Sequence, residues 1–100
     1  MQVQNQEALT TVTARCFKGL GDPVRLEIMR MLETGEKSVS EMVAALGLPQ
    51  NLVSMHLGCL RWCGCVSTRK ESHFVYYSLT DPRVTEIIRL AEGLLQGSEV

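Results

Sequence analysis

Two short helical patterns separated by a very tight connection constrain this chain more than any other feature. The first begins with Ser38-Val39-Ser40-Glu41, which fits a capping box because Glu follows Ser by three residues. The second runs over about residues 50–63 and carries apolar side chains at helical spacing, at Leu52, Val53, Leu57 and Leu60. Only Gly47-Leu48-Pro49 connects the two. So short a turn between two helices predicts a helix-turn-helix over about residues 39–63.

The second of these helices has a polar face in its first two turns, consisting of Gln50, Asn51, Ser54 and Met55, with His56 beside them. Gln and Asn can pair bidentately with adenine, and Ser can bond bases or phosphates. An ordinary solvated helix face would look the same, so the polar face alone does not decide between the two interpretations.

The distribution of charge favours DNA. The whole chain has a formal net charge of −1, but residues 42–70 contain no Asp or Glu and include Arg61, Arg69 and Lys70. This segment therefore carries +3 and the remaining residues −4. A local positive footprint on a slightly acidic chain suits moderate, reversible DNA binding.

The rest of the chain predicts three more helices and a β-hairpin. After a polar start at residues 1–4, a first helix spans about residues 5–20. Asp22-Pro23 begins the second helix, because Asp is a good cap and Pro suits the first helical position. Two β-rich runs, residues 66–70 and 74–79, are joined by a loop at residues 70–73. Thr80-Asp81-Pro82 starts the last helix, over about residues 82–96.

These elements predict a mainly α fold with a small β-hairpin, namely a winged helix-turn-helix of about five helices. The two-stranded wing spans about residues 65–79, and residues 1–100 form a single domain. Arg69, Lys70 and His73 lie near the wing tip, where they would meet phosphate or the minor groove. The aromatic run at residues 74–77 is explained mostly by sheet and core packing.

Size and hydrophobic pattern together predict a homodimer. A chain of 100 residues has a modest core, and a palindromic DNA site also calls for two subunits. The last helix carries a long apolar stripe with the small Ala91 in its middle, so we expect it to form the interface with the first helix. No apolar run reaches transmembrane length and no secretory signal opens the chain, which predicts a cytoplasmic location without membrane contact. The four cysteines are then expected to be thiols or ligands, not structural disulfides.

About residues 15–95 resemble the ArsR/SmtB family of metal-sensing winged-helix repressors. The resemblance rests on Leu20 to Ile28, Val39-Ser40-Glu41, Leu46-Gly47-Leu48, Gln50, Val53-Ser54, His56-Leu57, Leu60-Arg61, Gly64 and Val75 to Leu79. It implies a homodimer formed through the first and last helices. It also implies a repressor that binds its operator without metal and leaves it when metal binds.

The family's cadmium- and lead-sensing branch, which resembles CmtR, has the pattern His-Leu-x-Cys-Leu-x-x-Cys-Gly on the recognition helix. Residues 56–64 match it in full, so the resemblance assigns Cys59 and Cys63 as metal ligands. Four residues apart, the two are neighbours on one helix face, although both could instead be small buried apolar residues. That branch takes its third thiolate from a cysteine near the C-terminus, and residues 92–100 contain none. We choose Cys16, reaching from the partner subunit, as the third ligand. Packing of Cys16 in the core or the dimer interface is an equal alternative. Cys65 is expected to be structural.

The sequence thus predicts a repressor that responds to a thiophilic ion, with Cd(II) or Pb(II) ahead of Hg(II) or As(III), because soft ligands select soft ions. An alternative on the same fold is a thiol redox switch that forms a disulfide. The geometry of a disulfide is less constrained in Cys63-Gly64-Cys65 than between two cysteines within one helix. We expect no enzyme and no small organic substrate, since a small helix-turn-helix chain offers neither a substrate cleft nor an activating environment.

Overall fold

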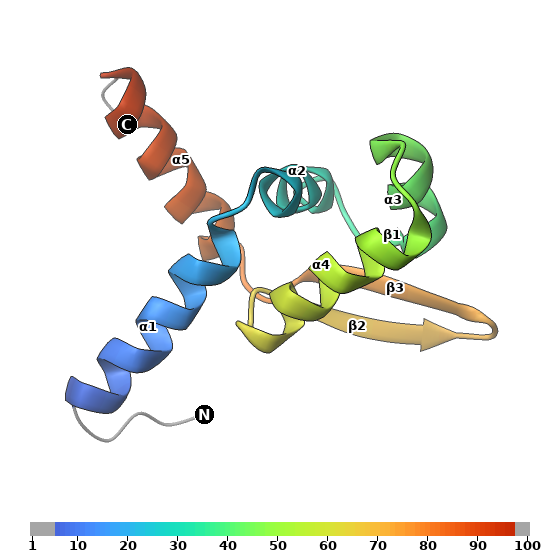
Figure 1. Cartoon of the computed structure of the whole chain (residues 1–100), viewed down its shortest axis with the longest axis horizontal. Coiled ribbons are helices and arrows are strands. Elements are labelled where there is room, and N and C mark those ends of the chain that lie inside the picture. Colours follow the sequence, from blue (N-terminus) through green and yellow to red (C-terminus); the bar gives the residue numbers. More distant parts are fainter. Residues whose placement is uncertain (1–5, 98–100) are drawn as a thin grey trace.

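The computed structural model describes residues 6–97, and the polar start predicted at residues 1–4 lies outside them. Five helices and three strands follow one another along the described residues (Figure 1). In chain order they are α1 (Gln6–Leu20), α2 (Pro23–Leu32), β1 (Lys37–Ser38), α3 (Val39–Leu46), α4 (Gln50–Trp62), β2 (Val66–Glu71), β3 (Phe74–Leu79) and α5 (Arg83–Gln96). The predicted mainly α winged helix-turn-helix is confirmed.

Helix ends form where the sequence predicts them. The Asp22 carboxylate accepts hydrogen bonds from the backbone N–H groups of Val24 and Arg25, at 2.8 and 3.1 Å, and so caps α2. Ser38 and Glu41 form the expected capping box at the start of α3. Gly47 ends α3 with φ at 67°, a left-handed conformation that only glycine adopts without strain. Pro49 and Pro82 each occupy the N-cap position of their helix, directly before its first helical residue.

The sheet is larger than predicted, with three antiparallel strands in the order β1-β3-β2. Strand β1 was not expected, because it has only two residues and Ser38 already serves as the cap of α3. The hairpin turn is also tighter than the predicted loop at residues 70–73. Lys70 pairs with Val75 and Glu71 with Phe74, which leaves Ser72 and His73 alone in the turn.

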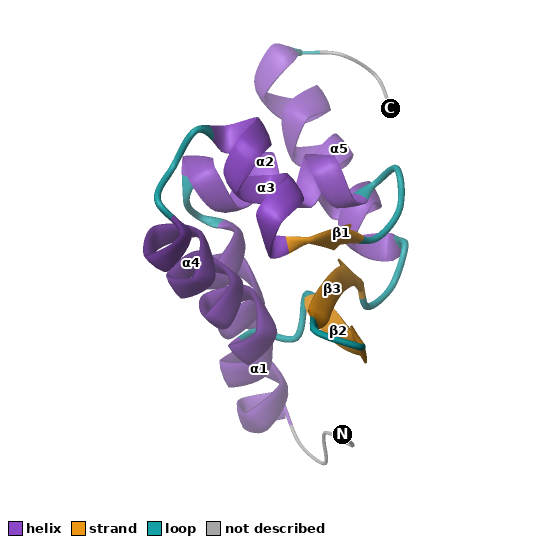
Figure 2. Cartoon of the chain, turned by 90° about the vertical axis from the view of Figure 1, so that its right-hand side faces the viewer, coloured by secondary structure: helices purple, strands orange, loops and turns teal. Residues whose placement is uncertain are grey.

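The core lies where α2, α3 and α4 meet the sheet. Its fully buried side chains include Ile28, Met29, Met42, Val53, Leu57 and Leu60. Figure 2 shows α4 along one edge of the molecule, with the strands on the other side. Helices α1 and α5 extend away from the wing tip (Figure 1) and keep large apolar side chains exposed, such as Phe17 and Leu95.

No single helix within residues 6–97 is long and apolar enough to cross a membrane. Taken together, α3 and α4 would qualify by length and composition only, and they bend by 116° at their junction.

Candidate nucleic-acid interface and thiol cluster

One side of α4 is exposed over its first two turns, and the other is core. Gln50, Asn51, Ser54 and Met55 all lie on the exposed side, and we call these four residues the reading face. The helical period puts Val53, Leu57 and Leu60 on the opposite side, where they are fully buried. The core therefore holds α4 in place while its polar side chains stay free to contact a ligand.

His56 does not belong to the reading face, which corrects the expectation that it contacts DNA. Its side chain is buried, and its Nδ1 lies 3.2 Å from a terminal guanidinium nitrogen of Arg25. Positions 53, 56, 57 and 60 have the spacing of one helical stripe, so the periodicity could have placed His56 in the core. Arg25 also donates from its Nε to the carbonyl oxygen of Gly19 at 2.6 Å, and thereby connects the end of α1 to α4.

The charged residues of the wing have different surroundings. Arg69 donates to both carboxylate oxygens of Glu36, at 2.6 and 3.2 Å, and its guanidinium lies 4.8 Å from the centre of the Tyr76 ring. The bond from Arg69 lowers the pKa of Glu36, so this carboxylate stays ionised and balances the guanidinium charge. Lys70 is exposed and makes no such pair among the described residues. A phosphate would therefore have to replace Glu36 to engage Arg69 fully, whereas Lys70 is available.

His73 lies at the wing tip close to the start of α4. Together with Ser38, Ser40, Gln50 and Phe74 it lines a small pocket of about 190 Å³. The structure thus brings one predicted wing contact, His73, to the same place as one predicted helix contact, Gln50. Sequence spacing alone did not show this proximity, because it depends on how the hairpin folds back beside α4.

Three of the four cysteines gather where α4 meets the first wing strand. The sulfur atom of Cys65 lies 3.2 Å from that of Cys63 and 4.0 Å from that of Cys16. We call these three residues the thiol cluster. Cys59 is partly buried and makes no hydrogen bond with another cysteine within residues 6–97. The structure therefore places Cys65, which we expected to be purely structural, between two of the predicted ligands, and Cys16 contacts it within one chain.

The thiol cluster is held in a tight and partly apolar setting. Cys65 is 2% exposed, and this burial raises the pKa of its thiol well above the usual value. Cys63 donates from its Sγ to the carbonyl oxygen of Leu60 at 3.3 Å. Within residues 6–97, no group of three or more His, Cys, Asp or Glu side chains is already arranged to hold a metal ion. The thiol cluster in this structure is therefore a set of neighbouring thiols and not a formed metal-binding site.

Gly19 explains how α1 comes so close to the thiol cluster. A Cβ atom at this position would lie 2.3 Å from the Sγ and 2.8 Å from the Cβ of Cys63. On the other side, a pocket of about 430 Å³ borders the three cysteines, with Arg83 and Val84 of α5 among its lining residues. The cluster is therefore packed against α1 on one side and open to a pocket on the other.

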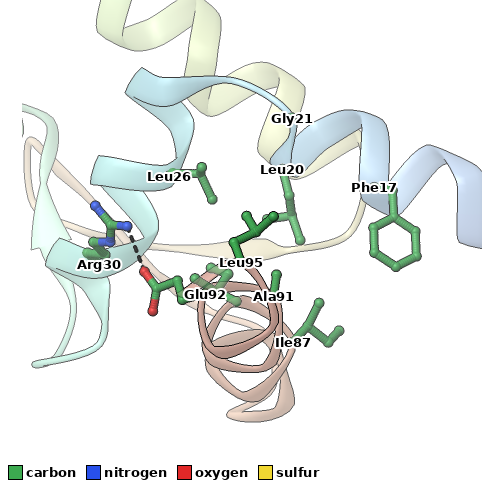
Figure 3. Close-up of a pocket in the computed structure, with 10 residues that line it drawn as sticks. Phe17, Leu20, Gly21, Leu26, Arg30, Ile87, Ala91, Glu92 and Leu95 are labelled. Carbon is green, nitrogen blue, oxygen red and sulfur yellow. Dashed lines mark hydrogen bonds and ion pairs between the residues drawn. The ribbon is translucent and has the colours of Figure 1, made fainter. Parts of the chain in front are cut away.

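A further pocket, an apolar groove, lies between α1 and α5 (Figure 3). It has a volume of about 350 Å³, and Phe17, Leu20, Ile87, Ala91 and Leu95 contribute apolar side chains to it. We call it the α1–α5 groove. At its rim Arg30 and Glu92 form an ion pair at 2.7 Å, which Figure 3 shows as a dashed line. The groove lies mainly on the two helices predicted to form the dimer, and Leu26 and Arg30 of α2 also line it.

The chain is similar to several known proteins. The family model described as "Bacterial regulatory protein, arsR family" matches residues 22–68. The "Probable mercury resistance operon repressor" of Streptomyces lividans is 43% identical over 82 residues, which cover 82% of this chain and 66% of that protein. Among solved structures, reduced HlyU from Vibrio cholerae is 36% identical with a TM-score of 0.77, covering 92% of this chain and 97% of that chain. The homodimeric winged helix-turn-helix DNA-binding domain from Mycobacterium bovis is 28% identical with a TM-score of 0.84, covering 96% and 91%.

Proposed function

Because the chain belongs to the arsR family of bacterial regulatory proteins, we propose that it is a repressor that releases operator DNA when a thiophilic metal ion binds. It binds the operator as a homodimer in the absence of the ion. One observation carries this proposal: the same helix, α4, has an exposed reading face at its start and ends at Cys63 in the thiol cluster. The element that would contact bases is therefore also the element that an ion would move.

DNA contact would involve two parts of the protein. The reading face of α4 enters the major groove, where its side chains meet base edges. Lys70 and His73, exposed on the wing, meet the phosphate backbone, and Arg69 joins them when a phosphate displaces Glu36. The α1–α5 groove joins the two subunits, so that two copies of α4 face successive half-sites.

We predict that Gln50→Ala and Ser54→Ala each weaken specific operator binding by about 1–3 kcal/mol, because each removes one base contact. Both side chains are exposed and make no core contacts, so the dimer should stay folded. Fluorescence anisotropy with operator and with unrelated DNA at the same salt concentration measures the two affinities. Gln96→Ala, an exposed glutamine on α5, serves as the matched control. Equal losses on both DNAs would show that the reading face is assigned incorrectly.

The effector is proposed to be Cd(II) or Pb(II), with Hg(II) or As(III) as further candidates. The sequence motif proposes Cys59 and Cys63 as ligands, with Cys16 as the third. The closeness of Cys16, Cys63 and Cys65 supports a soft ion at this end of α4, since thiolates favour such ions. Similarity to a mercury resistance operon repressor points to the same class of ion.

The experiment is operator binding by reduced protein under anaerobic conditions, with and without each ion. A loss of about 100-fold in affinity on metal addition corresponds to a coupling free energy of about 2.7 kcal/mol. We expect Cd(II) to cause such a loss and a chelator to reverse it. Operator affinity that stays constant with all four ions would contradict the metal proposal.

A thiol redox switch is the second candidate, and the 3.2 Å between the sulfur atoms of Cys63 and Cys65 favours it. A peroxide would accept two electrons as the two thiols lose their protons and join in a disulfide, which yields two waters from hydrogen peroxide or one alcohol and one water from an alkyl hydroperoxide. In that case DNA release needs the oxidant and no metal, and a reducing thiol reverses it. The same anisotropy assay separates the two candidates when metal and peroxide are added separately.

A further inference from the structure

We propose that the metal site consists of Cys16, Cys63 and Cys65 of a single subunit, and that Cys59 is not a ligand. This inference rests on the proposed function for its biological role, but it concerns which sulfur atoms bind the ion. It differs from the motif-based assignment in two respects. Cys65 becomes the central ligand, and the third sulfur comes from the same chain and not from the partner.

The distances between the sulfur atoms are the first argument for this site. Zinc–thiolate bonds of about 2.3 Å would place the corners of a planar three-sulfur site about 4.0 Å apart, and a larger ion such as Cd(II) needs the sulfur atoms further apart. The sulfur atoms of Cys16 and Cys65 are separated by 4.0 Å, which is close to the length of one edge of such a triangle. Cys63 lies 3.2 Å from Cys65, which is the contact of one thiol with another. Binding an ion therefore requires the sulfur atom of Cys63 to move away from that of Cys65.

The binding step replaces contacts that the thiols now make with each other. The three thiols lose three protons to solvent, and the ion takes the place of the contacts that Cys65 makes with Cys63 and Cys16. As the side chains now stand, no group of three or more His, Cys, Asp or Glu side chains within residues 6–97 could hold a metal ion, so binding requires the three thiols to rearrange. The pocket of about 430 Å³ beside the cysteines gives the ion a route to them.

The position of these ligands connects three parts of the molecule. Cys16 belongs to α1, Cys63 caps the end of α4, and Cys65 immediately precedes β2. An ion bound to all three joins a helix of the α1–α5 groove, the recognition helix and the wing. By contrast, a site made from Cys59 and Cys63 alone would lie within α4 and its cap, and would leave the wing untouched.

The test is a titration of the full chain with Cd(II) under reducing, anaerobic conditions, followed by sulfur-to-metal absorption in the ultraviolet. We expect Cys16→Ser, Cys63→Ser and Cys65→Ala each to weaken Cd(II) binding at least about 100-fold, because each removes one of three thiolates. Cys59→Ser distinguishes the two ligand assignments: it should bind Cd(II) like the original chain if Cys59 is not a ligand, and weakly if the motif-based assignment holds. Circular dichroism and metal-free operator binding check that each variant is folded, and Ala at position 65 keeps that buried site apolar.

Mixed dimers decide which chain supplies Cys16. A heterodimer of one Cys16→Ser subunit and one Cys65→Ala subunit contains no complete site if all ligands come from one chain. It contains one complete site if Cys16 reaches across to the partner. We expect no tight Cd(II) binding by this heterodimer, and one tightly bound ion per dimer would overturn the single-subunit assignment.

The possible results distinguish an error in the ligand assignment from an error in the proposed function. Loss of binding in Cys59→Ser together with normal binding in Cys65→Ala would overturn the ligand assignment and leave the metal-sensing proposal intact. Tight Cd(II) binding that depends on Cys65 but does not release DNA would contradict the proposed function and support the site. Absence of any sulfur-to-metal absorption would overturn the site.

Discussion

Leu95→Lys is expected to convert the dimer into a monomer and to weaken operator binding at least about 100-fold, equivalent to about 2.7 kcal/mol. Leu95 is 85% exposed in the single chain, so the substitution removes almost no core packing from the subunit itself. Its side chain lines the α1–α5 groove together with those of Phe17 and Ala91 (Figure 3). In a two-fold symmetric dimer formed through this groove, two lysines would enter the interface, where an unpaired charge costs several kcal/mol.

Sedimentation velocity measures the change in association, and anisotropy measures the change in operator affinity. Gln96→Lys is the matched control, because it adds the same charge to an exposed polar position one residue further along α5. We expect this control to remain dimeric and to bind the operator normally. A Leu95→Lys protein that stays dimeric at micromolar concentration would show that the subunits associate through another surface.

Gly19→Ala is expected to lower the free energy of unfolding by about 1–2 kcal/mol. The added methyl group would lie 2.3 Å from the sulfur of Cys63, so α1 must move away from the end of α4. The higher helix propensity of alanine offsets part of this strain, which is why the net loss is modest. Urea unfolding followed by circular dichroism measures the difference.

Gly58→Ala provides the opposite case on α4. A Cβ at position 58 meets no atom within 4 Å, so only the gain in helix propensity remains. We expect this variant to be more stable than the original chain by about 0.5–1 kcal/mol. If both glycine variants were equally stable, the close packing of α1 against Cys63 would be absent in solution.

Signals confined to a few neighbouring residues were readable from the sequence. Asp22 caps α2, and Ser38 with Glu41 forms a capping box, because each of these contacts spans no more than three residues. The β-rich composition of the wing strands and the apolar stripe on α4 were equally local. These features were sufficient to predict the winged fold, with β1 missed because two residues carry no period.

Contacts between distant parts of the chain were not readable in the same way. Cys16 and Cys65 are 49 positions apart, and they meet only because α1 packs across the junction of α4 and β2. Arg69 lay in an acid-free segment, yet it pairs with Glu36, which is 33 positions away. His56 is an exception, because its position on the apolar stripe of α4 can be read from the sequence. A histidine in a DNA-binding motif suggests an exposed contact, whereas the stripe predicts burial, and the structure follows the stripe.

The contact between Arg15 and Trp62 gives the protein an internal optical probe. Trp62 is the only tryptophan of the chain, and the guanidinium of Arg15 on α1 lies 4.4 Å from the centre of its ring. The indole is 60% exposed and precedes Cys63 directly. Its emission wavelength and intensity respond to a nearby cation, to water and to a heavy atom. Fluorescence of the unlabelled protein would therefore follow in real time any displacement of α1 relative to the end of α4.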